Sequence, residues 1–211
     1  LVLLRGEGAE RSQLYWRDRM VPLETLIRGT NSFGIEDLSI FAINHLAGIM
    51  SDPGTVPGAG NVFLRRINIR LNRFEKLWSQ FLLDRLKLRN LESVDRNMGA
   101  VAIDGENVQV TDCDIFSSHA PFRFNGNYGL FSNNRCFEGG TSAFISGTQV
   151  IFENNVVEGS QLARGLAQFG RRDLYYANNR IGNMATGDAE LFTSDGIGCQ
   201  AVVKIVSTAG A

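Results

Sequence analysis

Apolar residues recur at alternate positions in short runs along most of the chain, which is the pattern of half-buried β-strands. The runs return at steps of 21, 21 and 24 residues, so that equivalent positions fall into columns. Four columns define the repeat: Ile103, Phe124, Ile145 and Phe169; Val110, Phe131, Phe152 and Tyr176; Cys113, Asn134, Asn155 and Asn179; and Ile115, Cys136, Val157 and Ile181. A period of this length, built from short strands and turns, predicts a solenoid.

The same alternation extends toward the N-terminus, through Ile35, Leu38 and Ile40 and then through Leu64, Ile67 and Ile69. We therefore predict one all-β domain over residues 1–211, a single-stranded parallel β-helix of about seven coils. Glycines mark the predicted corners at positions 29, 105, 126, 147 and 196.

Pairs of asparagines interrupt three of the strand-like runs, although Asn is depleted from strands. The second member of each pair is Asn134, Asn155 or Asn179, which share one column. If the coils stack about 4.8 Å apart, these amides lie above one another and can bond along the stack. We predict a structural asparagine ladder, with the preceding Asn133, Asn154 and Asn178 facing the other way and closing the turn.

Two segments depart from the repeat. The Gly and Pro density of residues 41–60 predicts a surface loop insertion. Residues 71–97 leave two alternatives open. Phe74, Leu77, Trp78, Phe81 and Leu82 have helical spacing, whereas Leu86, Leu88 and Leu91 fit the strand columns, so the segment is either an inserted helix or an extra coil.

The composition of the chain mainly argues against certain partners and sites. The formal net charge is −1, from 21 basic and 22 acidic residues, which does not favour a nucleic-acid partner. No apolar run is long enough to span a bilayer, and no secretory leader precedes the repeats. The three cysteines have no metal-ligand spacing and an odd count, so we predict neither a disulfide framework nor a metal site. Because the chain starts in the middle of the pattern, we expect a fragment of a longer protein.

The phrases GENVQVTDCDIFSS, NYGLFSNNRCFEGG and TQVIFENNVVEGS resemble the right-handed parallel β-helix proteins of the pectate-lyase-like superfamily. The resemblance covers roughly residues 23–196. It implies a right-handed β-helix with the asparagine column at the corner between the second and third strands of each coil. It also implies an extended polysaccharide bound along the outside of the first sheet. No catalytic motif of pectate lyases or polygalacturonases is found, so the resemblance assigns no catalytic residue.

Alternation within the predicted first sheet places several polar side chains on its outer face. Asp104, Arg123, Asn125 and Ser146 lie there if Ile103, Phe124 and Ile145 face inward. Bordering loops contribute Glu138 and Glu158, and Tyr175 is a candidate for stacking on a sugar ring because its neighbour Tyr176 faces the core. An acid, a guanidinium and amides on one face suit a hydroxyl-rich or uronate-bearing ligand.

Two groups of residues are candidates for catalysis. Asp195 with Asp188 or Glu190 has the two carboxyl groups that glycoside hydrolysis needs, although the same residues also suit an ordinary turn. Asp104 with His119 and Arg123 has the base, proton shuttle and cation that a lyase needs, although a lone His in a loop is also typical of a turn.

Two other features carry less weight. His45 has the same two interpretations as His119, with less support. The basic run of Arg65, Arg66, Arg70 and Arg73 favours a solvated strand surface over an anion site.

Our leading hypothesis is a carbohydrate-active enzyme domain, a glycoside hydrolase or a polysaccharide lyase. The rival hypothesis is a non-catalytic adhesin, polysaccharide-binding module or tailspike-like stalk on the same fold. We expect polysaccharide as the partner, no membrane insertion, and a secreted or cell-surface parent protein. No cofactor is predicted; a Ca²⁺ requirement is left open, with no support from the sequence.

Overall fold

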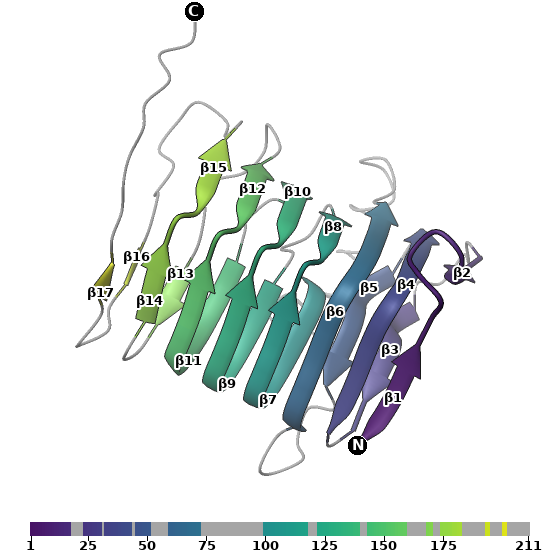
Figure 1. Cartoon of the computed structure of the whole chain (residues 1–211), viewed down its shortest axis with the longest axis horizontal. Coiled ribbons are helices and arrows are strands. Elements are labelled where there is room, and N and C mark those ends of the chain that lie inside the picture. The colour runs from purple at the N-terminus through teal and green to yellow at the C-terminus, as the bar shows by residue number, and fades with distance from the viewer. Residues whose placement is uncertain are drawn as a thin grey trace, which may run out of the picture.

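The computed structural model of the chain describes residues 1–17, 23–30, 32–43, 45–51, 59–72, 99–117, 122–139, 143–159, 168–170, 174–182, 193–194 and 200–201. Within these ranges the fold is all-β, without a helix. Every strand pairing there is parallel. Figure 1 shows β6, β7, β9 and β11 side by side in chain order. This all-parallel arrangement is compatible with a parallel β-helix.

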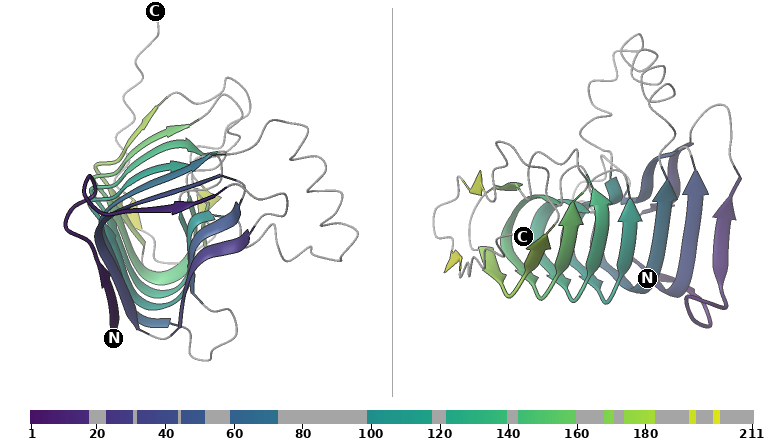
Figure 2. Two further views of the ribbon diagram at one scale, coloured as in Figure 1. Left: turned by 90° about the vertical axis from the view of Figure 1, so that its right-hand side faces the viewer. Right: turned by 90° about the horizontal axis from the view of Figure 1, so that it is seen from above.

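The pairings group the strands into three parallel sheets, because five long strands each take part in two of them. These five are β4 (Phe33–Ile43), β6 (Ala59–Asn72), β7 (Gly99–Thr111), β9 (Phe122–Ser132) and β11 (Ala143–Glu153). In Figure 2, strands of successive repeats overlie one another when the molecule is viewed along its long axis.

The first sheet contains the early parts of β7, β9 and β11. Its other members are β3 (Leu23–Gly29), β5 (His45–Ser51), β13 (Gln168–Gly170) and β16 (Thr193–Ser194).

The second sheet contains the early parts of β4 and β6 and the later parts of β7, β9 and β11. It is completed by β1 (Val2–Arg5), β14 (Leu174–Ala177) and β17 (Gln200–Ala201).

The third sheet contains the later parts of β4 and β6. It is completed by β2 (Gln13–Trp16), β8 (Asp114–Ser117), β10 (Arg135–Gly139), β12 (Val156–Gly159) and β15 (Arg180–Gly182).

The register confirms the columns predicted from the sequence. Val110 lies opposite Phe131, which lies opposite Phe152 and then Tyr176. Ile103, Phe124, Ile145 and Phe169 form another matched row, as do Ile115, Cys136, Val157 and Ile181. Toward the N-terminus, Ile35, Leu38 and Ile40 lie opposite Leu64, Ile67 and Ile69. Like residues are therefore stacked from repeat to repeat.

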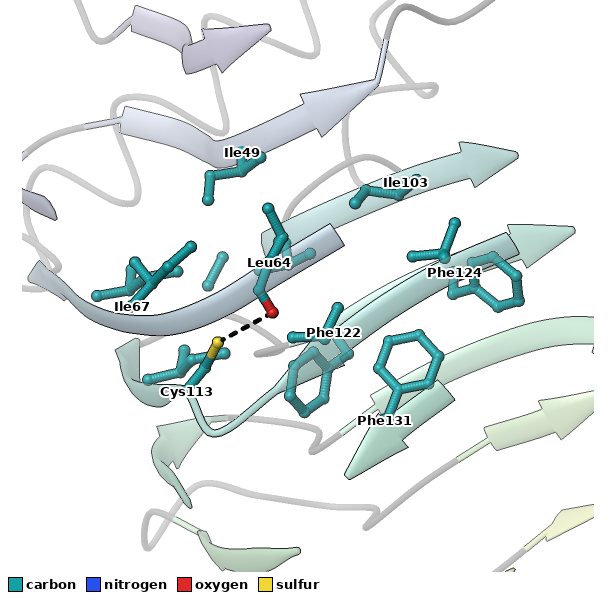
Figure 3. Close-up of a cluster of buried hydrophobic side chains, with 14 of the residues drawn as sticks. Ile49, Leu64, Ile67, Ile103, Cys113, Phe122, Phe124 and Phe131 are labelled. Carbon is teal, nitrogen blue, oxygen red and sulfur yellow. Dashed lines mark hydrogen bonds between the residues drawn. The ribbon is translucent and has the colours of Figure 1, made fainter. Parts of the chain in front are cut away.

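The inward columns form one continuous core. Phe122, Phe124, Phe131 and Phe152 are each at most 1% exposed, and their rings pack together with centroids 5.3–6.2 Å apart. Tyr176 stacks on Phe152 with a 5.6 Å centroid separation. Figure 3 shows part of this core beside the aliphatic side chains of Ile49, Leu64, Ile67 and Ile103. The aromatic column is thus a core and not a surface platform.

The structure corrects the two ends of the loop predicted over residues 41–60. Residues 41–43 end β4, His45–Ser51 form β5, and Ala59 and Gly60 begin β6. Gly48 lies inside β5 because the adjacent backbone comes close: a Cβ there would lie 2.5 Å from the carbonyl oxygen of Ala100. At position 48 the glycine therefore reflects close strand packing and not a loop. Residues 52–58 lie outside the described residues, as does all of the segment 71–97 after Asn72.

The asparagine ladder is present at the corner between the second and third sheets. The side-chain oxygen of Asn155 accepts hydrogen bonds from the backbone N–H of Asn134 (3.0 Å) and from its side-chain amide (3.0 Å). The Asn155 amide donates to Phe131 O and to Asn179 Oδ1, both at 3.0 Å. Asn134 and Asn155 are fully buried. Each amide thus satisfies backbone groups of neighbouring repeats that the strands do not pair.

The residues before the ladder positions have left-handed backbone conformations. The φ angles of Asn133, Asn154 and Asn178 are 58°, 54° and 54°. Asn tolerates this conformation better than most residues, and all three are exposed. The paired asparagines therefore have different roles: the first closes the turn and the second bonds within the stack.

We expect Asn155→Ala to lower the free energy of unfolding by about 2–5 kcal/mol, because it leaves the Asn134 N–H and the Phe131 carbonyl buried without partners. Asn154→Gly is the matched control one residue away. Its backbone conformation suits glycine, so we expect a change within about 1 kcal/mol. Urea unfolding followed by circular dichroism measures both. Equal losses in the two variants would contradict the ladder's stabilising role.

Candidate functional site

The outer face of the first sheet carries the polar residues predicted there. Ile103 and Phe124 are each 1% exposed and face the core, so that Asp104, Arg123 and Asn125 face outward between or beside them. Asp104 lies opposite Asn125 in the register, and Asn125 lies opposite Ser146. An acid and an amide therefore occupy one row across adjacent strands, with the backbone of Ser146 next in line.

The strand that carries Asp104 is anchored by a buried serine of β5. The backbone N–H of Asp104 donates to Ser51 Oγ (2.8 Å), and the same hydroxyl donates to the Asp104 carbonyl (3.2 Å). Ser51 is 2% exposed. These two bonds hold the backbone of Asp104 in place and leave its carboxyl group on the outer side.

Partial burial raises the pKa of the Asp104 carboxyl, because the charged form loses hydration. The positive charge of Arg123, one strand further along the sheet, acts in the opposite direction and only partly compensates. A carboxyl group with a raised pKa on a sheet face is a candidate proton donor.

Glu106 is a second carboxyl group close to Asp104 in the chain that the sequence-based hypotheses omitted. It lies two residues after Asp104 in β7, is exposed, and accepts a hydrogen bond from the Asn127 amide (3.2 Å). Its register partner is Gly60 of β6, so Glu106 lies at the corner where β7 passes from the first sheet to the second. The sequence Asp104-Gly105-Glu106 could have indicated two neighbouring carboxyl groups at this position.

Part of the outer face is covered. Ala102 lies on the outer side between the inward-facing Val101 and Ile103, yet it is only 6% exposed. It forms a small cluster with Met50, 4% exposed, apart from the main core. Met50 lies opposite Ala102 in the register. The outer face is therefore apolar and buried at these two residues and polar at Asp104 and Asn125.

The other predicted site residues are not brought to this row. Tyr175 lies on the second sheet and is 43% exposed, with Ile151 as its strand neighbour. The backbones of Glu138 and Glu158 lie in β10 and β12 of the third sheet, and His45 begins β5. His119, Asp188, Glu190 and Asp195 lie outside the described residues.

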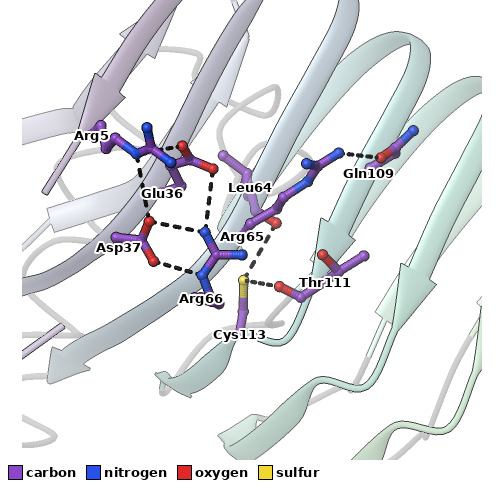
Figure 4. A network of polar contacts seen from close by, with 9 residues as sticks. All are labelled: Arg5, Glu36, Asp37, Leu64, Arg65, Arg66, Gln109, Thr111 and Cys113. Atoms are coloured by element: carbon purple, nitrogen blue, oxygen red, sulfur yellow. Dashed lines mark hydrogen bonds and ion pairs between the residues drawn. The ribbon is translucent and has the colours of Figure 1, made fainter. Parts of the chain in front are cut away.

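The arginines of the basic run bond to acids and aromatic rings. Arg66 pairs with Asp37 through two bonds (2.6 and 2.9 Å) and contacts Glu36 (3.5 Å), while Arg5 contacts the same two acids (Figure 4). The Arg66 hydrogen bond lowers the pKa of Asp37.

The next two arginines follow the same rule. Arg70 bonds Asp114 (3.2 Å) and lies over the ring of Phe116, and Arg65 lies 4.8 Å from the ring centroid of Phe63. Arg73 lies outside the described residues. These contacts favour the predicted strand surface over an anion site.

Cys113 and Cys136 are buried free thiols, as expected for small apolar residues. Burial raises the pKa of Cys113 to about 12, and its Sγ contacts the carbonyls of Thr111 (3.2 Å) and Leu64 (3.6 Å; Figures 3 and 4). Neither thiol is therefore a nucleophile at neutral pH.

Comparison with models of known protein families, with curated proteins and with solved structures gave no match. In the part of the chain that the structure describes, no group of three or more His, Cys, Asp or Glu side chains is placed to hold a metal ion. No helix of the described ranges is long and apolar enough to cross a membrane.

The raised pKa of Asp104 predicts a pH-dependent effect of its substitution. Between the ordinary value of 3.8 and the raised folded value, the folded protein binds more protons than the unfolded chain, so stability falls as pH rises through this window. We expect Asp104→Asn to unfold at higher urea concentration than the unsubstituted chain at neutral pH. Below the ordinary value the difference should shrink, because both states are then protonated.

Urea unfolding at a series of pH values measures this difference. A difference that is the same at every pH would show that the carboxyl group titrates alike in the folded and unfolded states.

Proposed function

We propose that the chain is a right-handed parallel β-helix of the pectate-lyase-like type, with about seven coils. The regular register of like residues, the three parallel sheets and the asparagine ladder support this assignment. We further propose that it binds an extended polysaccharide along the outer face of the first sheet, and that its parent protein is secreted or displayed at the cell surface. In this fold like side chains repeat about every 4.8 Å, which suits a polymeric ligand.

The observation that carries the proposal is the Asp104 carboxyl, which has a raised pKa, lies beside Arg123 and shares a row with Asn125. Amide and guanidinium groups bind sugar hydroxyls and uronate carboxylates. A carboxyl that holds its proton at higher pH can deliver it to a leaving glycosidic oxygen. The site therefore favours a carbohydrate-active enzyme.

Glu106 completes the pair of carboxyl groups for glycoside hydrolysis. Residues two apart on an extended strand have Cα atoms about 7 Å apart. Inverting glycosidases hold their two carboxyl groups about 6.5–9.5 Å apart to admit a water molecule, and side chains on Cα atoms this close together can reach that separation. In this mechanism Asp104 is the acid, Glu106 is the base, and Asn127 positions Glu106. A lyase would instead use Arg123 to stabilise the developing enolate of a uronate.

The alternative function is a non-catalytic polysaccharide-binding module, adhesin or stalk. Ion pairs between repeats favour it, since Arg66 with Asp37 and Arg70 with Asp114 use their charges to join adjacent strands. In this alternative the first sheet binds sugar without cleaving it.

We expect Asp104→Asn and Glu106→Gln each to reduce cleavage of the preferred polysaccharide by about 10²–10⁴-fold, because each removes a proton-transfer group. The assay measures reducing ends and unsaturated uronates from plant, algal and microbial polysaccharides. Glu10→Gln, an exposed carboxylate between β1 and β2, is the matched control and should leave the rate unchanged.

Unsaturated products would assign elimination, and reducing ends without them would assign hydrolysis. Binding of a polysaccharide without cleavage by the unsubstituted chain would favour the non-catalytic module. Full activity in both variants would remove Asp104 and Glu106 from the mechanism.

A further inference from the structure

The outer face of the second sheet carries a mainly apolar, partly exposed row, called the apolar row, that the proposed polysaccharide site does not use. The row follows adjacent strands through Phe63, Gln109, Leu130, Ile151 and Tyr175. Ile151 is 40% exposed and Tyr175 is 43% exposed. Large apolar side chains gathered on one exposed sheet face are typical of an interaction surface.

A second row runs beside the first, two residues further along each strand. Its first two members, Arg5 and Glu36, form an ion pair with each other (2.9 Å). From Glu36 the row passes to Arg65 and then through Thr111 and Ser132 to Glu153. Alternation places these residues on the outer side of the sheet, because Leu64 and Phe152 between the rows are buried in the core. Arg65, Thr111 and Glu153 are half-buried there, and Ser132 is 7% exposed. Arg65 and Glu153 therefore flank two neutral positions. The backbones of these two charged residues are about 14 Å apart, across three strand spacings.

This order of charges is complementary to itself. A two-fold axis parallel to the strands, midway between Thr111 and Ser132, reverses the row on a second copy. It places Arg65 of each copy opposite Glu153 of the other, and Thr111 opposite Ser132. In the apolar row the same operation places Phe63 opposite Ile151, and Gln109 opposite Leu130. Such an isologous arrangement pairs each patch with itself.

The charged side chains have unequal partners within one chain. Arg65 bonds the Gln109 side chain (3.0 Å) and lies over the Phe63 ring, so its guanidinium is held on the face against the first row. Among the described residues the Glu153 carboxylate has no hydrogen-bond or ion-pair partner in the structure. A second copy would supply the missing cation.

An exposed tyrosine at the corner beside these rows also favours contact with a second copy. Tyr128 is 53% exposed and has a φ angle of 59°, which is unfavourable for a bulky residue. The aligned positions in two earlier repeats are Asn61 and Asn107, which tolerate this conformation better. The two-fold axis would place Tyr128 opposite Asn107 of the second copy, so the aromatic side chain would gain a partner there.

We propose that the outer face of the second sheet is a homodimer interface, in which two copies pack face to face with their strand stacks running in opposite directions. The interface joins the apolar rows and two symmetric Arg65–Glu153 ion pairs. Across these rows the described residues place no like charges opposite each other. The residues of the two rows are distinct from those of the proposed polysaccharide site, which lie on the first sheet and at its corner with the second.

The test is a charge reversal in the chain of residues 1–211, with dissociation measured by analytical ultracentrifugation. We expect a concentration-dependent dimer of the unsubstituted chain. Arg65→Glu and Glu153→Arg should each raise the dissociation constant at least about tenfold, because each brings like charges together. The double variant should restore dimerisation, since it exchanges the ends of the ion pair. Tyr175→Ser should also weaken the dimer.

Arg180→Glu, an exposed residue of the third sheet, is the matched charge control and should have no effect. Circular dichroism and thermal unfolding establish that each variant is folded. A monomer at every concentration would overturn the proposal.

Two other outcomes would also overturn it. A dimer that tolerates both single reversals but is lost in Val2→Lys would move the interface to the edge strand β1. A monomer whose Tyr175→Ser variant loses polysaccharide binding would assign the face to sugar.

Discussion

The corner between the second and third sheets sets the main physical constraint on this chain. Backbone groups at this turn are buried, and buried N–H and C=O groups need partners. The strand ladders end before they reach them. Asn134, Asn155 and Asn179 supply these partners, because each side-chain amide has both donors and an acceptor. Asn134 and Asn155 bond to the repeats on both sides, and Asn179 bonds to the repeat before it. The stack depends on equal spacing of these amides.

The ladder ends where the column changes chemistry. Cys113 donates its backbone N–H to Asn134 Oδ1 (3.0 Å), and its thiol lies against the backbone carbonyls of Leu64 and Thr111. In the two earlier repeats the position of Cys113 is taken by Leu38 and Ile67, which stand two residues before Ile40 and Ile69. Both are buried and apolar. The N-terminal repeats therefore rely on aliphatic packing and on ion pairs such as Arg66–Asp37, whereas the later repeats rely on amides and stacked aromatic rings.

Core packing and the buried hydrogen bonds involve only inward-facing residues, so the outer faces of the sheets can differ in chemistry. The first sheet carries Asp104 and Arg123, whose charges influence each other. The second sheet carries an apolar row bordered by Arg65 and Glu153. Parallel stacking repeats each outward position at a fixed spacing, so a few substitutions in register are enough to build a linear surface. Sugar binding and dimerisation are proposed for separate faces for this reason.

The sequence by itself determined which residues face inward and which of them stack. The repeat period can be read from the spacing of Phe131, Phe152 and Tyr176. The ladder asparagines recur three residues after each of them. The sequence also predicted the acid and amide row at Asp104 and Asn125, since strand alternation alone places them.

Only the tertiary structure decided the rest. Residues 45–51 looked like a loop because Gly48 is needed where the backbone of Ala100 comes close. Tyr175 proved to lie on a different sheet from Asp104, and Ala102 proved to be covered, because the corners between sheets and the burial of an outer face arise from contacts far apart in the chain. Local periodicity shows on which side of a strand a residue lies. Packing between repeats decides on which sheet face the residue lies, which other residues share that face, and how exposed its side chain is to solvent.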